Sequence, residues 1–364
     1  MPKINSINGA PPAHGGDVYQ LARSLGVRVD DLVDFSANLN PLGYPTGLAA
    51  ALSEALPDVV HYPDRRCREL TASLADFHGL DPASMLVGNG STELIFLVAR
   101  ALKPRKALII APAFSEYAQA LAAAQVPLAY HYTPEAQHFT MDGSVSTNGA
   151  DLVFLANPAS PSGALLPPDR LAAIISPWLT AGAKVILDEA FIDFAEEASL
   201  KGRLGEFPGL MILRSFTKIY AIPGIRLGYL LGAPDLVETV AACQEPWSVG
   251  SLAQAAGLAC LEDRDYLEKS RDLVRRERTH LGSQLAALGG LTVFPSAANY
   301  LLVKITRPGW TAARLRQALL AHRLIIRDAS NFAGLDERFL RLAVRRREEN
   351  DRLLAALAQV LGEG

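Results

Sequence analysis

The chain has 364 residues, of which 49% are hydrophobic and 20% are charged, and its formal net charge is −3. This composition is that of an ordinary globular protein and excludes the disordered and collagen-like classes. The small net charge gives no electrostatic reason to expect nucleic acid or an anionic membrane surface as a partner, so we expect a small-molecule ligand.

The cysteines and the N-terminus indicate a cytoplasmic protein. Cys67, Cys243 and Cys260 are widely separated and form neither a C-x-x-C pair nor an even-numbered disulfide framework. The first residues lack the basic start and apolar run of a secretory signal, and no apolar stretch reaches the length of a membrane span. A chain of this length is expected to form two lobes.

Short apolar runs recur through the middle of the chain, each followed by turn residues and a helix-like segment, at 106–112, 151–158, 184–189, 210–215 and 227–232. Runs that are apolar at consecutive positions are typical of strands covered on both faces. We therefore predict an α/β lobe with a mostly parallel sheet. Such sheets bind ligands beyond the carboxyl ends of their strands, where Asn157, Asp188 and Ser215 lie, so these residues are expected to share a pocket.

The remainder of the chain has a mixed pattern. Helical periodicity covers 252–288, strand-like pieces follow at 291–294 and 300–304, and a helix over 311–322, a strand over 339–344 and a final helix from Glu348 complete it. The first forty or so residues are too short to fold alone. We predict an N-terminal segment (1–45) that packs on a small α+β domain (263–364), with a large domain (46–262) between them.

Lys218 is the first candidate for chemistry, because it follows the apolar run that ends near Ser215. A lone lysine in such a place is more often a surface residue whose stem covers apolar neighbours. Asp188 changes that interpretation, since a carboxylate at a buried strand end needs a cation. A protonated pyridine nitrogen is such a cation, and enzymes that use pyridoxal 5′-phosphate (PLP) need an acidic partner there to keep the ring an electron sink.

Three further features suit the same cofactor. Asn157 stands in a turn after a strand, where its amide could donate to the phenolic oxygen of the ring. The segment 88–95 has small residues and a helix start whose backbone N–H groups could hold a phosphate. Ser215 and Arg226 flank Lys218 and could complete the surroundings of that phosphate. Each feature alone is weak evidence, but their order along one chain is specific.

The motif Ser215-Phe-Thr-Lys218, continuing to Arg226, resembles fold-type I PLP enzymes of the class I/II aminotransferase family, and the resemblance extends over nearly the whole chain. It implies an α/β fold with a mostly parallel seven-stranded sheet, a homodimer with sites at its interface, and no metal. It also implies that Lys218 bonds to the cofactor, Asp188 pairs with the pyridine nitrogen and Asn157 meets the phenolic oxygen. The other implied cofactor contacts are Gly90, Ser91, Thr92, Ser215 and Arg226 at the phosphate, Phe114 stacked on the ring, and Tyr62 reaching the phosphate of the neighbouring subunit.

Within this family the segments from His14, 34–43, 188–194, 246–249 and 298–302 resemble the branch that decarboxylates L-threonine O-3-phosphate to (R)-1-aminopropan-2-yl phosphate in cobalamin biosynthesis. The substrate class implied is thus a phosphorylated amino acid. Arg341 matches the arginine that holds the substrate carboxylate, while His14, Asn38 and Arg327 match the pocket for the substrate phosphate, with Asn157 also beside the substrate. Without the resemblance, His14 would more simply be a loop histidine.

Two alternatives remain: an aminotransferase of the histidinol-phosphate type, and more remotely a protein that binds PLP without catalysis. Two departures from the family pattern bear on the site. Phe191 stands where many aminotransferases have a tyrosine that donates to the phenolic oxygen, and its simplest role is core packing. Ala159 and Ser160 stand where relatives commonly have two asparagines, a change that we expect to spare Asn157.

Overall fold

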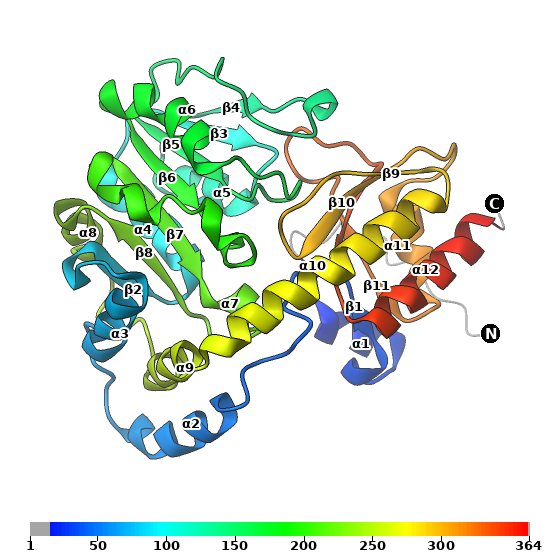
Figure 1. The fold of residues 1–364 in the computed structure, drawn as a ribbon, viewed down its shortest axis with the longest axis horizontal. Coiled ribbons are helices and arrows are strands. Elements are labelled where there is room, and N and C mark those ends of the chain that lie inside the picture. Colours follow the sequence, from blue (N-terminus) through cyan, green and yellow to red (C-terminus); the bar gives the residue numbers. More distant parts are fainter. Residues whose placement is uncertain (1–14, 363–364) are drawn as a thin grey trace.

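The computed structural model describes residues 15–362, which form a large α/β part and a smaller part joined by one long helix (Figure 1). The large part contains a seven-stranded sheet in the order β2-β8-β7-β6-β5-β3-β4. In this sheet β8 alone runs opposite to the other strands. This confirms the prediction of a mostly parallel seven-stranded sheet. The strands are β2 (Met85–Gly88), β3 (Ala107–Ala111), β4 (Leu128–Tyr132), β5 (Leu152–Ala156), β6 (Lys184–Asp188), β7 (Leu210–Ser215) and β8 (Gly228–Gly232).

Both faces of this sheet are buried, which explains why its strands are apolar at consecutive positions. Ile186 of β6 packs into one cluster, whereas Val185 and Leu187 pack into the cluster on the opposite face. The first cluster is closed by α4 (Gly90–Leu102), α5 (Ser115–Ala123) and α8 (Pro234–Ala241). The second is closed by α3 (Arg68–His78), α6 (Pro168–Thr180) and α9 (Ser251–Glu262), and α2 (Leu48–Ala55) lies against α9.

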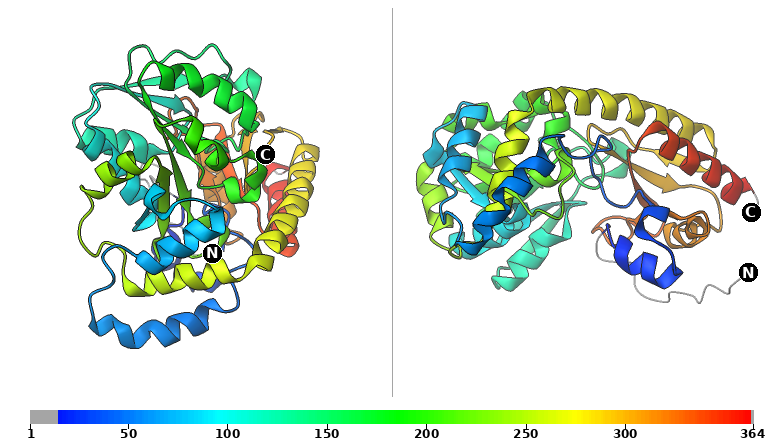
Figure 2. Two further views of the ribbon diagram at one scale, coloured as in Figure 1. Left: turned by 60° about the vertical axis from the view of Figure 1, so that its left-hand side comes forward. Right: turned by 90° about the horizontal axis from the view of Figure 1, so that it is seen from below.

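The smaller part is a four-stranded antiparallel sheet in the order β12-β13-β10-β9 with helices packed on it. Its strands are β9 (Leu291–Val293), β10 (Tyr300–Ile305), β12 (Arg327–Asp328) and β13 (Phe339–Ala343). Its helices are α10 (Arg264–Ala287), α11 (Ala312–Leu320) and α12 (Arg347–Gly362). Helix α10 runs from the large part along the smaller one, as both views in Figure 2 show.

The start of the described chain lies on the smaller part. Strand β1 (Val33–Asp34) pairs in parallel with β11 (Leu324–Ile325), and α1 (Val18–Leu25) packs Leu21 and Ala22 against Leu320 and Ile325. The chain then crosses to the large part, so residues near 34–42 pass between the two. Among the helices of residues 15–362, none is long and apolar enough to cross a membrane.

Candidate active site

A cavity of about 800 Å³ lies where the carboxyl ends of the large sheet face the smaller part. This volume falls in the range of small-molecule sites. Its lining comes from segments far apart in the sequence, because the strand ends of one part and the sheet of the other meet there. The predicted site residues that line it are Asn38, Ser91, Thr92, Phe114, Asp188, Ser215, Lys218, Arg226, Arg327 and Arg341.

Lys218 belongs to a one-turn helix, α7 (Phe216–Ile219), that begins directly after β7. Its Nζ lies 5.9 Å from the centre of the Phe191 ring. Burial lowers the pKa of Lys218 to about 8, and the positive charges of Arg341 and Arg226 act in the same direction. Near neutral pH a useful fraction of this amine is therefore uncharged, and the uncharged amine is the form that attacks a carbonyl carbon.

Asp188 is the last residue of β6 and is 8% exposed. Its Oδ1 accepts a hydrogen bond from the Ala190 backbone N–H at 2.9 Å, and its Oδ2 accepts one from the Tyr117 hydroxyl at 2.5 Å. Burial raises the pKa of Asp188, and these two donors together with the charge of Lys218 oppose that rise. The carboxylate is thus placed to meet a cation in the cavity.

The start of α4 and the loop before β8 form a site shaped for an anion. A Cβ atom on Gly90 would lie 2.6 Å from a guanidinium nitrogen of Arg226, and one on Gly228 would lie 2.6 Å from the Ser91 backbone nitrogen. The side chain of Asn89, at the N-cap of α4, makes no capping hydrogen bond. The first N–H groups of this helix, Arg226 and Ser215 therefore suit a phosphate group.

Two arginines from the smaller part face this cofactor site. Arg327 of β12 and Arg341 of β13 are direct partners across the antiparallel pair. Arg327 is 3% exposed and donates to Asn331 Oδ1 at 2.7 Å. Arg341 donates to the Ser36 carbonyl at 3.3 Å. When the Asn38 amide is oriented with its oxygen toward Arg341, that oxygen accepts a second hydrogen bond from Arg341 at 3.1 Å. Burial is the main reason that the pKa of each arginine falls to about 10, so both stay charged at neutral pH.

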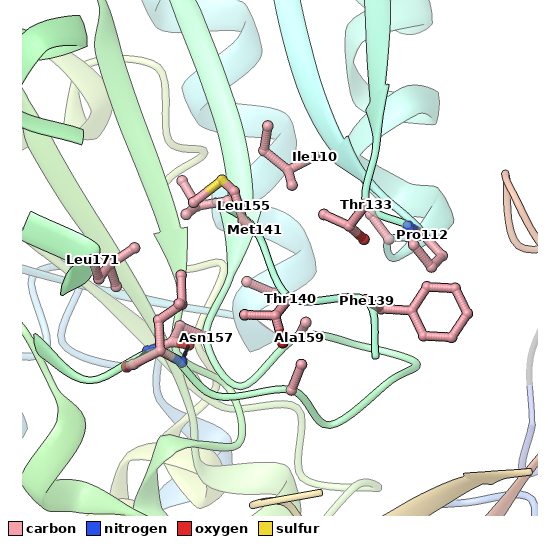
Figure 3. A pocket seen from close by; sticks show the side chains of 14 residues that line it. Ile110, Pro112, Thr133, Phe139, Thr140, Met141, Leu155, Asn157, Ala159 and Leu171 are labelled. Atoms are coloured by element: carbon pink, nitrogen blue, oxygen red, sulfur yellow. Dashed lines mark hydrogen bonds between the residues drawn. The ribbon is translucent and has the colours of Figure 1, made fainter. Parts of the chain in front are cut away.

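Asn157 requires a correction, because the structure does not bring its side chain to the main cavity. Its Nδ2 donates to the Leu166 carbonyl at 3.0 Å and its Oδ1 accepts from the Leu166 N–H at 2.8 Å. It lines a separate cavity of about 30 Å³, enough for a single water, beside Thr140 and Ala159 (Figure 3). Ser160, three positions later in the same loop, lines the main cavity instead. In this loop Ser160, and not Asn157, is therefore the polar residue that lines the main cavity.

The other predicted residues occupy different places. Gly90 lies under Arg226, as described above. Tyr62 is 80% exposed and packs on Trp247, with 4.6 Å between ring centres, away from the cavity of its own chain. Phe191 lines the cavity and packs edge-on against Tyr300. His14 lies outside the described residues.

Sequence reasoning missed Tyr117, Ser160 and Thr217. Thr217 lines the cavity and its hydroxyl lies 2.7 Å from that of Ser215. The signal for Tyr117 was its position one helical turn after Phe114, on the helix that begins at the cavity. In residues 15–362 no cluster of three or more His, Cys, Asp or Glu side chains could hold a metal ion.

The residues of this site fit PLP: a lysine with a lowered pKa, a buried carboxylate, and an anion site in which two glycines allow Arg226 and the start of α4 to approach closely. The model of the aminotransferase class I and II family matches residues 30–357, and the chain belongs to this family. That membership confirms the prediction of PLP as the cofactor.

The comparisons also identify particular relatives. Threonine-phosphate decarboxylase of Salmonella typhimurium strain LT2 is 40% identical over 354 residues, which is 96% of each chain. Among solved structures, the histidinol-phosphate aminotransferase of Clostridium acetobutylicum has a TM-score of 0.85 and 30% identity, covering 92% of this chain and 100% of its own. The L-threonine-O-3-phosphate decarboxylase of Porphyromonas gingivalis has a TM-score of 0.83 and 28% identity, covering 90% and 99%.

Proposed function

We propose that the chain is a PLP-dependent decarboxylase of L-threonine O-3-phosphate, acting in the cobalamin pathway that the resemblance implies. The observation that carries this proposal is the pair of buried arginines, Arg327 and Arg341, on neighbouring strands in front of Lys218. Both guanidinium groups line the cavity, and a substrate with a phosphate and a carboxylate offers an anionic group for each of them to bind. The 40% identity to a threonine-phosphate decarboxylase supports the same substrate.

The roles of the residues follow from their positions. Bound PLP supplies an electron sink for the pair of electrons left at Cα when carbon dioxide departs. Arg341 grips the substrate carboxylate, and Ser36 and Asn38 orient its guanidinium. Arg327, held by Asn331, takes the substrate phosphate. Lys218 returns a proton to Cα, and its pKa of about 8 lets it hold or release that proton near neutral pH.

Ser160 takes over the contact that the sequence had indicated for Asn157. Its side chain is 8% exposed, and Arg341 Nη1 lies 3.4 Å from its Oγ. A hydroxyl can donate one hydrogen bond and accept others, so Ser160 can donate to the phenolic oxygen while it accepts from Arg341.

The aminotransferase reaction on a phosphorylated substrate is the second candidate, because the same fold and 30% identity link the chain to a histidinol-phosphate aminotransferase. The phosphate site serves both reactions. Incubation with threonine phosphate separates them: we expect release of carbon dioxide without any 2-oxo acid acceptor. Formation of a keto acid that depends on such an acceptor, without carbon dioxide, would assign the chain to the aminotransferases.

The division of roles between the two arginines gives the sharpest test. Arg327→Ala should lose about 2 kcal/mol of recognition of threonine phosphate, roughly a thirtyfold fall in kcat/KM, because a charge-assisted hydrogen bond to phosphate is lost. Its preference for threonine phosphate over threonine should shrink accordingly. Arg341→Ala should lower kcat/KM for both substrates, since both carry the carboxylate. An equal loss of preference in the two variants contradicts this division.

We further propose that the chain works in the cytoplasm as a homodimer, in which Tyr62 reaches the cofactor phosphate of the neighbouring subunit. Its three cysteines are free, as a reducing compartment requires. Exposed apolar side chains gather around Tyr62, namely Leu56, Val59, Val60 and Trp247. A patch of this kind is typical of an interface, and a second copy would bury it.

A further inference from the structure

Tyr117 is the one tyrosine of residues 15–362 whose hydroxyl donates to the Asp188 carboxylate. It lies on α5, its side chain is 0% exposed, and the 2.5 Å distance to Oδ2 is that of a charge-assisted hydrogen bond. Asp188 Oδ1 is held separately by the Ala190 N–H. Each carboxylate oxygen therefore has its own fixed donor, and the plane of the carboxylate is set from two sides.

The ring of Tyr117 has no room to turn away from this contact. It stacks on Phe154 with 5.1 Å between ring centres and an angle of 15°. Phe114, the residue proposed to stack on the cofactor, also meets the Tyr117 ring edge-on, with 5.9 Å between ring centres and an angle of 88°. The Tyr117 side chain thus contacts both Phe114, which is proposed to stack on the cofactor ring, and Asp188, which is proposed to meet the ring nitrogen.

We propose that Tyr117 is a positioning residue that holds Asp188 charged and correctly oriented toward the pyridine nitrogen of PLP. This inference rests on the proposed role of Asp188. Burying a carboxylate without hydrogen-bond donors costs free energy. The groups that face the Asp188 carboxylate from other elements are the Lys218 cation of α7 and the neutral Tyr300 hydroxyl of β10. The two fixed donors keep the carboxylate ionised while leaving lone pairs directed at the cavity, where the ring nitrogen carries its proton.

A comparison of two cofactors tests this inference. Full-length protein freed of cofactor is titrated with PLP and with a deaza analogue in which C–H replaces the ring nitrogen. Both compounds have an aldehyde and the same phosphate, so contributions of Lys218 and Arg226 cancel when the ratio of the two dissociation constants is compared between wild type and variant. In the wild type we expect PLP to bind much more tightly. Tyr117→Phe keeps the ring, removes the hydroxyl and should reduce that ratio by about tenfold, as the loss of a charge-assisted bond predicts.

Tyr229→Phe is the matched control, because Tyr229 is also buried and its hydroxyl is bonded outside the site, to His78 Nε2 at 2.7 Å. Tyr229→Phe should leave the ratio of the two dissociation constants unchanged within about twofold.

If Tyr117→Phe weakens the binding of both compounds equally, or of neither, Tyr117 has only a packing role and the inference is overturned. Asp188→Ala should abolish the preference for PLP. If Asp188→Ala keeps the preference for PLP, the proposed role of Asp188 itself fails. If Asp188→Ala loses the preference but Tyr117→Phe keeps it, only the inference about Tyr117 is overturned.

Discussion

At the scale of single residues, the site depends on ionisable groups whose burial is costly until a ligand is bound. Lys218 is the clearest case. Burial disfavours its charged form, and Arg341 and Arg226 add repulsion, so its pKa falls to about 8 from the 10.5 of a free lysine. The same property that makes the amine reactive lowers the stability of the protein without cofactor.

Stability measured against pH tests this cost. Between about pH 8 and 10.5 the unfolded chain still holds the lysine proton that the folded chain has released, so stability rises with pH in this window. Below about pH 8 the folded protein bears the full free-energy cost of burying the charged lysine. Lys218→Met without cofactor should therefore be more stable than the wild type near pH 7, and its advantage should shrink by about pH 10. Urea denaturation of both proteins at each pH measures the difference. An advantage that does not change with pH would contradict the lowered pKa.

At the scale of elements, the short helix α7 is held by residues from elsewhere in the chain. A helix of one turn leaves its carbonyl groups without partners inside the helix. The Asn40 N–H donates to the Lys218 carbonyl at 3.0 Å, and Asn40 Nδ2 donates to the Ile219 carbonyl at 2.7 Å. The hydroxyl of Tyr266, from α10, also donates to the Ile219 carbonyl at 2.9 Å. The element that carries the reactive lysine is thus fixed by the N-terminal segment and by α10.

Asn40→Ala removes the side-chain part of this support. We expect it to destabilise the protein by about 1 to 2 kcal/mol, since Tyr266 still serves the Ile219 carbonyl. Asn40→Asp keeps the size of the side chain but places a carboxylate against that carbonyl, so it should cost more than Asn40→Ala. Denaturant unfolding gives the order of the three proteins. Wild-type stability in Asn40→Asp would show that the side chain does not support α7.

At the scale of the whole molecule, the proposed dimer adds Tyr62 of one subunit to the cofactor site of the other. Val60 and Tyr62 are 78% and 80% exposed in the single chain, on the segment between α2 and α3. Val60→Asp places a charge in the proposed interface, where burial without a partner is costly. We expect a dimer for the wild type in sedimentation, a shift to monomer for Val60→Asp, and weaker PLP binding because Tyr62 of the neighbour is lost. Ala358→Asp, at an exposed position of α12, is the control and should remain a dimer. A monomeric wild type with full activity would refute the proposal.

Much of the fold could be predicted because its signals are local in sequence. Strands buried on both faces are apolar at each position, so the runs that contain β3, β5, β6, β7 and β8 were found. Strand β4 escaped notice because its residues are only partly buried and include His131 and two tyrosines. Strands β11 and β12 are two residues long, too short for any periodicity to appear.

The sequence by itself determined the class of site: a lysine motif after one strand, a carboxylate at the end of the strand before it, a glycine-rich helix start and two arginines near the end of the chain. Only the tertiary structure decided which side chains meet. Asn157 turns away because Leu166, nine residues later, offers its side chain both a donor and an acceptor, whereas Ser160 of the same loop lines the cavity. Tyr117 reaches Asp188 across 71 positions because α5 packs over the central strands. Contacts of this kind depend on the paths of distant segments, and local sequence patterns carry no record of those paths.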